Sequence, residues 1–516
     1  MTSLGKACEH KEMPHVVIVG AGAVGSNTAL VLDKLRGIQV TLISDRGLLQ
    51  GSAIRCANLA HTDSFEYYKR DHVLTGEGCM DGGSTEYLAR KGMCDFKLSA
   101  PHAHNPTRFF VSKQTQASGL SESEFFGNVD HMGRHFSKQH AYITERRGKD
   151  AATEKLGRTP EQFSRPLRDE EWDGLKPSLA YGVMGSSHGV DMARYYGVVR
   201  ASLDKSQTKT ELHANITSFE RLSDGRTTVQ FTDHAGSSKK VMADYVILAA
   251  GHHNPWLATK VPGSLPSCAG THFLNYMLHL RLPATHDKAL IKYLSTLNFT
   301  LQGPGGCMLL GVRLPTETED GVATVYYPDE QGNQFAKHTY NPGKPECVPA
   351  WWDDILAKGL PHDHPNIQAS FKRACEFYPY LRGYAAIEHV VWGTVFNADE
   401  KTMNPDGLDR RVRIIANVHH VTHDARIAMW HSPKWTTALL VAFMAANDAR
   451  VTCGLPPLPR DEVHGFGPYK LDMEKITGEM GINFDDVTGV DPSSLDAWAK
   501  QFVTENDLPE RLARHY

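Results

Sequence analysis

The feature that most constrains this chain is the glycine-spaced turn Gly20-Ala-Gly22-Ala-Val-Gly25 near its N-terminus. A short β-branched run precedes the turn, as expected of a buried parallel strand, and an apolar-periodic segment predicts that a helix follows. In such a unit the first glycine permits the tight turn, the second lets a phosphate approach the backbone, and the third lets the helix pack on the strand. A diphosphate would then meet the N-terminus of the helix.

An acidic residue follows at the distance that this unit requires. A second strand is expected over 39–43, and Asp45 comes directly after it, about 20 residues beyond Gly25. A carboxylate at this place binds a ribose hydroxyl in dinucleotide-binding folds. Glycine-rich turns are common by themselves, but here the strand, the helix and the acid all stand where the motif needs them. The stretch therefore predicts a dinucleotide site.

Length and composition indicate a multidomain chain without a membrane span. At 516 residues, the chain exceeds what one hydrophobic core usually supports, so two or more structural domains are expected, which can be interleaved. Hydrophobic residues make up 41%, and no apolar run approaches the length of a transmembrane helix. The first 13 residues carry lysine, glutamate and histidine where a secretory signal would be apolar. We expect a cytoplasmic protein, with peripheral membrane contact left open.

Cysteine, charge and histidine patterns exclude several kinds of site. Nine cysteines without paired spacing fit reduced thiols better than a disulfide framework. The net charge is −4 and the basic residues are dispersed, so nothing favours nucleic acid as a partner. His131 and His135 would share one helix face, but no carboxylate of the HExxH kind lies between them, and among 27 histidines such pairs arise by chance. No metal site is predicted.

Separated stretches predict one nucleotide-binding domain. A helix is expected over 189–202, and strands over 211–219 and 227–231 flank a turn signal at 223–225. A further buried strand leads through Val-Ile-Leu-Ala-Ala to Gly251, and its small residues would let a ligand pass. Farther on, a strand-like stretch at 412–416 comes before Lys-Trp-Thr-Thr at 434–437, which opens an apolar helix with free N–H groups and a positive charge.

The rest of the chain predicts an insertion, a second domain and a tail. One stretch is polar and interrupted by prolines, which favours an inserted helical or cap region. Another contains candidate strands separated by proline and glycine clusters, which favours a mainly antiparallel sheet over the substrate. The expected units are the nucleotide-binding domain at 14–99, 185–260 and 400–452, the insertion at 100–184, the substrate domain at 261–399, and a linker with a helical tail at 453–516.

Together these pieces resemble FAD-dependent oxidoreductases of the D-amino-acid-oxidase superfamily, which includes sarcosine and glycine oxidases, malate:quinone oxidoreductase and FAD-dependent glycerol-3-phosphate dehydrogenase. The resemblance rests on the glycine motif, Asp45-Arg46, Gly51-Ser52, Asn-Leu-Ala-His at 58–61, the strand to Gly251 and the Lys-Trp-Thr-Thr helix. It implies an α/β fold with a Rossmann-like FAD-binding domain, an interleaved antiparallel-sheet substrate domain and a helical insertion.

The resemblance also implies a set of cofactor contacts. The residues expected to hold FAD are Gly20, Gly22 and Gly25 at the diphosphate, Asp45 at the ribose, Arg46 beside the adenine, Ser52 at a phosphate, Ile216 at the adenine through its backbone, Gly251 close to the cofactor, and Lys434, Trp435 and Thr436 at the flavin pyrimidine. Positive potential at that last point would stabilise the anionic reduced flavin.

Catalytic candidates follow from the same resemblance. Some members attach the flavin covalently through a histidine near the position of His61, but the local sequence here favours noncovalent FAD. Members that bind carboxylates place an arginine over the flavin, and Arg413 and Arg426 are the candidates, with no motif that selects one. The residues we predict as catalytic are His61, His253, Arg426 and His431.

The sequence thus predicts an FAD-dependent oxidase or dehydrogenase that oxidises a C–OH or C–NH bond of a small polar substrate, such as a hydroxy acid, an amino acid or a polyol phosphate. Hydride would pass to flavin N5, and oxygen or a quinone would accept the electrons. Two alternatives stay open. A flavin monooxygenase shares the architecture and the first motif, and would consume reduced nicotinamide and oxygen. A non-catalytic flavoprotein-like scaffold would bind a partner through the insertion.

Overall fold

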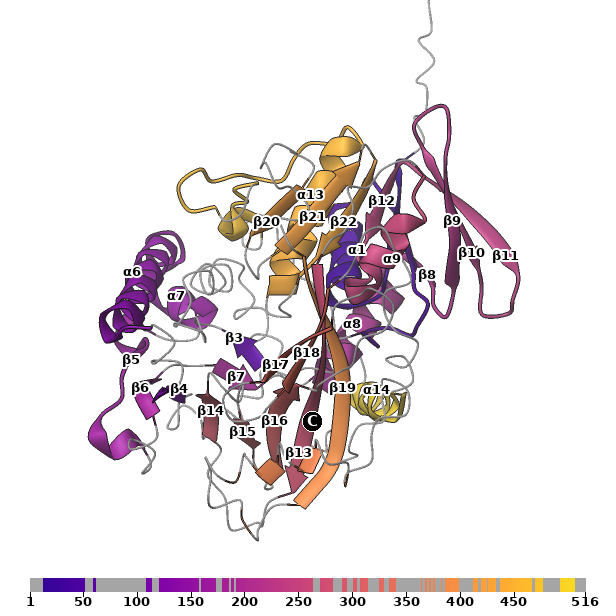
Figure 1. Ribbon diagram of the computed structural model, residues 1–516. Helices are drawn as coiled ribbons and strands as arrows, with labels where there is room; N and C mark the ends of the chain where they lie inside the picture. The colour runs from indigo at the N-terminus through magenta and orange to yellow at the C-terminus, as the bar shows by residue number, and fades with distance from the viewer. Residues whose placement is uncertain are drawn as a thin grey trace, which may run out of the picture.

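A computed structural model of the chain gives the architecture. It describes residues 13–51, 59–61, 108–113, 120–156, 159–172, 179–184, 187–189, 192–262, 270–281, 290–294, 300–303, 307–313, 324–328, 334–339, 363, 367–368, 371–372, 375, 382, 386–398, 412–415, 419–424, 426–432, 437–465, 469–476 and 492–505. Two large sheets organise these residues (Figure 1).

The first sheet is mainly parallel, with β1 (His15–Val19) in the middle of its parallel strands. On one side of β1 lie β2 (Gln39–Ile43) and β8 (Lys209–Glu211), and on the other lie β12 (Tyr245–Leu248) and β22 (Ile427–His431), followed by the antiparallel β21 (His419–Asp424) and β20 (Val412–Ile415). Both faces of β1 are covered. Val16 and Ile18 belong to one hydrophobic cluster, and Val17 and Val19 belong to another. This explains why β1 is an unbroken apolar run instead of an alternating one.

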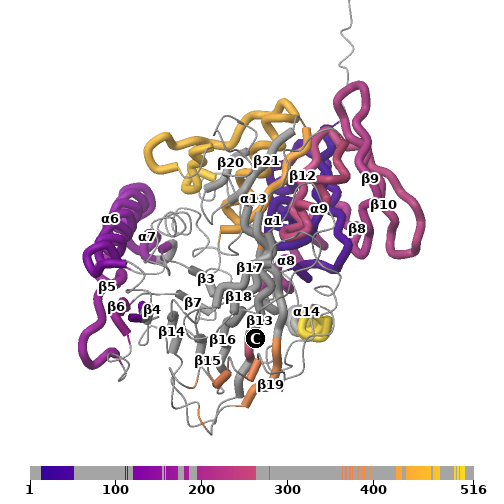
Figure 2. Tube along the Cα trace, viewed as in Figure 1, coloured from indigo at the N-terminus to yellow at the C-terminus, as the bar shows by residue number. Residues whose placement is uncertain are grey.

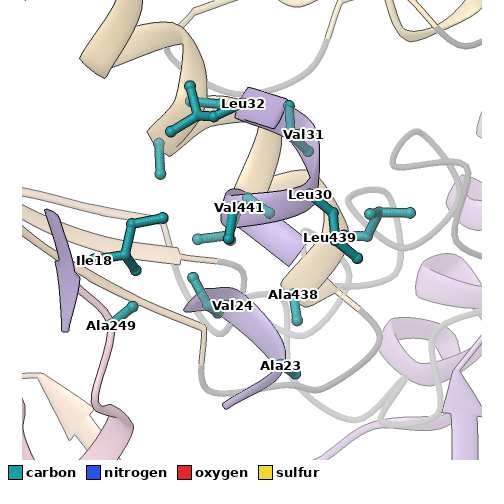
Figure 3. Close-up of a cluster of buried hydrophobic side chains, with 14 of the residues drawn as sticks. Ile18, Ala23, Val24, Leu30, Val31, Leu32, Ala249, Ala438, Leu439 and Val441 are labelled. Carbon is teal, nitrogen blue, oxygen red and sulfur yellow. The ribbon is translucent and has the colours of Figure 1, made fainter. Parts of the chain in front are cut away.

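Helices cover the face of this sheet that carries the side chains of Val16 and Ile18. They are α1 (Ala23–Leu35), α8 (Met192–Lys205), α13 (Ala438–Thr452) and α14 (Pro492–Glu505). Helix α1 packs along α13, and in Figure 3 Leu30 of α1 lies beside Leu439 of α13. Helix α13 is buried around most of its circumference, which accounts for its nearly unbroken apolar sequence.

The other face carries a three-stranded antiparallel sheet and a short helix. The strands are β9 (Asn215–Arg221), β10 (Thr227–Thr232) and β11 (Ser238–Ala243), and the helix is α9 (Asn254–Thr259). The predicted turn between β9 and β10 is confirmed, and Gly225 takes a φ of +84° there. The single strand expected over 211–219 is wrong. The chain leaves the parallel sheet after β8 and turns at His213, with φ +55°, before it begins β9.

The second sheet is almost entirely antiparallel, as predicted. Its strand order is β17 (Thr324–Pro328), β18 (Gln334–Thr339), β13 (Gly270–Arg281), β16 (Cys307–Arg313), β15 (Thr300–Gly303), β14 (Leu290–Leu294), β4 (Arg108–Ser112), β6 (Leu179–Met184) and β5 (Arg165–Pro166), and β19 (Ala386–Ala398) also pairs with β13. A separate small sheet joins β3 (Leu59–His61) to β7 (Ser187–Gly189).

The stretch expected as a helical insertion contributes strands as well as helices. Its helices are α6 (Glu122–Arg147) and α7 (Lys149–Leu156), with 3-10 turns η2 (Pro160–Gln162) and η3 (Asp169–Trp172). Its strands β4, β5 and β6 extend the second sheet, where β4 pairs with β14. Phe125, Val129, Met132 and Phe136 form the buried face of α6. The strands of the insertion therefore belong to the second sheet. Figure 2 shows α6 on the opposite side of the view from β9.

Two further observations concern membrane-spanning helices and metal-ligating side chains. Among the helices that the structure describes, none is long and apolar enough to cross a membrane. No group of metal-ligating side chains gathers within the described ranges. His131 is exposed on α6, where it faces solvent.

The C-terminal stretch is more closely packed than a linker and tail. Leu458, Leu471, Met473 and Ile476 belong to the same cluster as α1 and α13. From there the chain reaches α6, because Tyr142 donates its hydroxyl to Asp461 Oδ2 at 2.7 Å. The described residues 453–465 and 469–476 thus connect the parallel sheet to the insertion.

Candidate cofactor site

The candidate site lies at the carboxyl edge of the parallel sheet. Strands β2, β1, β12 and β22 all run in the same direction, so the turns that follow them meet at one edge. Helix α1 begins there after β1, and α13 begins there after β22. Ligands of open α/β sheets bind outside the carboxyl ends of the strands.

The three glycines of the turn have different surroundings. Gly20 has a φ of +106°, and a Cβ atom on it would lie 2.6 Å from the carbonyl oxygen of Ala249. A Cβ atom on Gly25 would overlap the carbonyl oxygen of Gly20. Among the residues that the structure describes, none lies within 4 Å of a Cβ atom on Gly22. Gly20 and Gly25 therefore allow the turn to pack closely, while Gly22 faces open space that a side chain would fill.

The first turn of α1 is arranged to receive an anion. Gly22 is the N-cap and offers no side chain, and no acidic residue occupies the first turn. Ser26 fixes the turn by donating its hydroxyl to the carbonyl of Ala21 at 3.0 Å. N–H groups at a helix N-terminus lack intrahelical partners and carry partial positive charge. Together with the open space at Gly22, this arrangement fits the diphosphate of a dinucleotide.

Asp45 follows β2 and faces a residue that follows β12. Its Oδ2 atom lies 3.4 Å from Nδ1 of His253. Burial raises the pKa of Asp45, but the hydrogen bond and charge of His253 and the charge of Arg46 outweigh burial and hold the pKa below its usual value. Arg46 is half-buried beside it. The carboxylate is therefore ionised and available at the edge of the sheet.

His253 stands on a turn that is fixed by Asn254. The side chain of Asn254 is fully buried, accepts the N–H of Ala250 at 2.7 Å and donates to the carbonyl of Trp430 at 3.0 Å. Gly251 has a φ of +60°, and a Cβ atom on it would have no neighbour within 4 Å in the described part of the chain. Sequence reasoning missed Asn254. The pattern that could have revealed Asn254 is its amide side chain after two histidines and before a proline, shortly after a predicted buried strand.

His431 ends β22 and connects the two large sheets. Its imidazole is buried and donates from Nε2 to the carbonyl oxygen of Phe396, on β19, at 2.7 Å. Burial lowers the pKa of His431 to about 4, so the ring is neutral at neutral pH. Its position at the carboxyl edge agrees with the predicted site, but the Nε2 atom already has a structural partner. A catalytic role for His431 stays a prediction.

Arg426 does not lie at this edge, although the sequence analysis groups it with the site, and a catalytic role for it stays a prediction. It comes just before β22, so it stands at the amino end of a strand whose carboxyl end reaches the site. There its Nη1 atom lies 3.8 Å from Oδ1 of Asp244. The sequence analysis associated Arg426 with the strand that reaches the site, β22, but Arg426 lies at the other end of this strand.

The structure describes only some of the other residues that are predicted to contact the cofactor. Ile216 lies on β9, and its carbonyl accepts from Lys260 Nζ at 2.6 Å. Ala214, at the approach to β9, donates its N–H to the carbonyl of Ser44 at 2.7 Å, which puts this region beside the end of β2. His61 lies on β3, of whose side chains nothing is described. The predicted contacts Ser52, Lys434, Trp435 and Thr436 lie outside the described residues.

A parallel sheet with this glycine turn, joined to a large antiparallel sheet, defines the class of dinucleotide-binding proteins with a Rossmann-like sheet. The chain matches the family model "DAO: FAD dependent oxidoreductase" over residues 15–447 and belongs to that family. This confirms the resemblance, the α/β fold class and the class of enzyme, an FAD-dependent oxidoreductase. No curated protein matches the sequence.

Solved structures share the fold at low sequence identity. The L-amino acid deaminase from Proteus vulgaris is 14% identical, with 89% of this chain and 97% of that chain covered and a TM-score of 0.51. The L-α-glycerophosphate oxidase from Mycoplasma pneumoniae, solved with FAD bound, is 15% identical, with 86% of this chain and 96% of that chain covered and a TM-score of 0.50. Both similarities span nearly the whole of the solved chain.

Proposed function

We propose that this FAD-dependent oxidoreductase oxidises a C–OH or C–NH bond of a small polar substrate, in the class of hydroxy acids, amino acids and polyol phosphates. When bound, FAD supplies a hydride acceptor at flavin N5. Oxygen or a quinone is the proposed electron acceptor. The observation that carries the proposal is the open space in front of Gly22 at the uncapped start of α1, in a chain of the FAD-dependent family.

The proposal gives the residues at this edge distinct tasks. The N–H groups of the first turn of α1 hold the diphosphate, and the absence of a side chain on Gly22 leaves room for it. Gly20 and Gly25 keep the turn tight against Ala249. The carboxylate of Asp45 accepts hydrogen bonds from the ribose. These contacts bind and orient the cofactor, and none of them takes part in the oxidation itself.

The choice of substrate class is supported by the family and by two named relatives. One of the two solved structures is an L-amino acid deaminase and the other an L-α-glycerophosphate oxidase. An amino acid has an amine on the carbon beside its carboxylate, and glycerophosphate has a hydroxyl on a carbon near its phosphate. We propose the same chemical class here, and a basic or polar subsite to receive the anionic group.

We also propose that the FAD is held without a covalent bond. The support is the sequence around His61, which does not match the covalent members closely. Acid precipitation tests this directly. Flavin should appear in the supernatant, whereas a yellow precipitate, or a peptide containing His61 with the flavin mass, would show covalent attachment.

The experiment that tests the reaction is anaerobic reduction of the enzyme-bound flavin by a panel of hydroxy acids, amino acids and polyol phosphates. The proposal expects at least one class to bleach the absorption of oxidised flavin. Bleaching only by reduced nicotinamide, with a hydroxylated product once oxygen is admitted, would favour a monooxygenase. A chain that purifies without flavin and cannot be reconstituted would favour a scaffold.

A further inference from the structure

The pair formed by Asp45 and His253 spans the end of the central strand. Asp45 follows β2 and His253 follows β12, and these two strands flank β1 in the sheet. Neighbouring strands lie about 4.8 Å apart, so the two turns begin roughly 10 Å from each other. The side chains close this gap, with Oδ2 of Asp45 3.4 Å from Nδ1 of His253. The contact therefore crosses the carboxyl end of β1, where the glycine turn begins.

Both partners are held by their own backbone. On the Asp45 side, Ser44 donates its N–H to the carbonyl of Glu211 at 2.9 Å, and Leu49 donates to the carbonyl of Ala21 at 2.8 Å. On the His253 side, the backbone N–H of His253 donates to the carbonyl of Ala250 at 3.1 Å. Only the side-chain torsions remain to be fixed, and the contact between the two side chains fixes them.

The exposure of the pair argues against a purely structural task. The side chain of Asp45 is 43% exposed and that of His253 is 26% exposed. An ion pair that is open to solvent adds little to the stability of a fold. A carboxylate can accept about four hydrogen bonds, and a single imidazole N–H uses one of these positions. The carboxylate of Asp45, at 43% exposure, therefore keeps acceptor positions beyond the one that His253 uses.

We propose that His253 is a positioning residue for the cofactor: its Nδ1–H holds the carboxylate of Asp45 correctly turned for the ribose hydroxyls of FAD. This inference rests on the proposed function, because it assumes that Asp45 binds the ribose. Without His253 the carboxylate would rotate freely, and its ordering would have to occur on binding. The role replaces the catalytic one that the sequence suggested for His253.

The test is the dissociation constant of FAD, measured by quenching of flavin fluorescence as apoprotein is titrated. His253→Leu removes the donor and should weaken FAD binding by roughly 5- to 10-fold, the scale of losing one ordinary hydrogen bond. His253→Asn should stay within about 2-fold of the parent, because its side-chain Nδ2 stands where the Nδ1 of histidine stood. The matched control is His234→Asn, at an exposed histidine in the turn between β10 and β11, which should change nothing.

A double-mutant cycle separates this inference from the proposed function. In an Asp45→Ala background, His253→Leu should cause no further loss of FAD affinity. If Asp45→Ala alone leaves the affinity unchanged, the assignment of the ribose to Asp45 is wrong. If Asp45→Ala weakens FAD but His253→Leu causes the same loss in both backgrounds, or no loss in the parent, the positioning role is wrong and the proposed function stands. His253→Gln, which moves the amide outward by one methylene, supplies a second loss variant if His253→Leu does not fold.

Discussion

The carbonyl oxygen of Gly20 occupies the place where a Cβ atom of residue 25 would stand. Helix α1 can therefore pack onto the glycine turn only while residue 25 has no side chain. We predict that Gly25→Ala lowers the free energy of unfolding by about 1–3 kcal/mol, the cost of forcing one methyl group into a packed site. Thermal unfolding of the apoprotein measures this.

The matched control for that variant is Gly127→Ala. Gly127 also lies inside a helix, α6, but a Cβ atom on it would meet nothing within 4 Å. Alanine should stabilise this helix by about 0.5–1 kcal/mol, since glycine has the lower helix propensity. Equal unfolding temperatures for the two variants would contradict the close contact between Gly20 and Gly25.

Stability should depend on pH through His431. An unperturbed histidine has a pKa of about 6.5, and burial lowers the pKa of His431 to about 4. The unfolded chain therefore takes up a proton first. The contribution of His431 is complete above about pH 6.5 and is lost as the pH falls toward 4, by roughly 3 kcal/mol.

The measurement is urea unfolding of the parent and of His431→Gln between pH 7.5 and 4.5. Glutamine does not titrate, and its amide can donate to the carbonyl of Phe396 from the position of Nε2. The parent should lose more stability than the variant over this interval. Parallel curves would mean that the imidazole of His431 titrates alike in the folded and unfolded chain.

The contact between the insertion and the C-terminal segment should open when Tyr142 loses its hydroxyl. The ring of Tyr142 stacks on His464 with centroids 3.8 Å apart, and Asp461 accepts from both side chains. Arg147 adds an ion pair to Glu474 at 3.1 Å. Tyr142→Phe should weaken the local structure by about 1–2 kcal/mol, seen as faster amide hydrogen exchange over 458–474.

The control for this variant is Tyr181→Phe. The hydroxyl of Tyr181 donates to the carbonyl of Leu120, which lies within the insertion itself. Its loss should leave exchange over 458–474 unchanged. If both variants speed exchange there equally, the hydroxyl of Tyr142 does not hold the two segments together.

Arg426 should be dispensable for flavin reduction. It stands at the amino end of β22 and pairs weakly with Asp244, and both side chains are about one-third exposed or more. Arg426→Gln should leave the rate of anaerobic flavin reduction within about 2-fold and change stability by less than about 1 kcal/mol. A loss of 100-fold or more in stopped-flow reduction would return Arg426 to the catalytic residues.

Local patterns in the sequence were sufficient to predict the glycine turn, the position of Asp45 after a strand, and the antiparallel character of the second sheet. The turn and Asp45 depend on residues that are close together in the chain, such as the spacing from Gly25 to Asp45. The single strands of the antiparallel sheet also have local patterns, but the pairing of distant strands such as β13 and β19 does not. The contact of Asp45 with His253 was not predictable in this way, because it depends on β2 and β12 flanking the same strand. Topology also decides which end of β22 faces the site, and this is why Arg426 was assigned to it.

The insertion shows a second limit of sequence patterns. Its prolines and charges described the helices and turns around α6, but the strands β4 and β6 are short and pair with partners far away in the chain. A five-residue strand such as Arg108–Ser112 has little periodicity of its own. Its neighbours β14 and β6 make it part of a sheet.

The measurement that tests the account most directly is FAD binding by the parent chain and by Gly22→Leu. No described residue lies within 4 Å of a Cβ atom at position 22, so the variant should fold, yet its side chain would fill the space proposed for the diphosphate. We expect the parent to bind one FAD per chain and Gly22→Leu to bind none, with apoprotein unfolding temperatures that agree. Equal FAD occupancy in the two proteins, measured by absorbance of the released flavin, would contradict the assignment of the glycine turn to the cofactor.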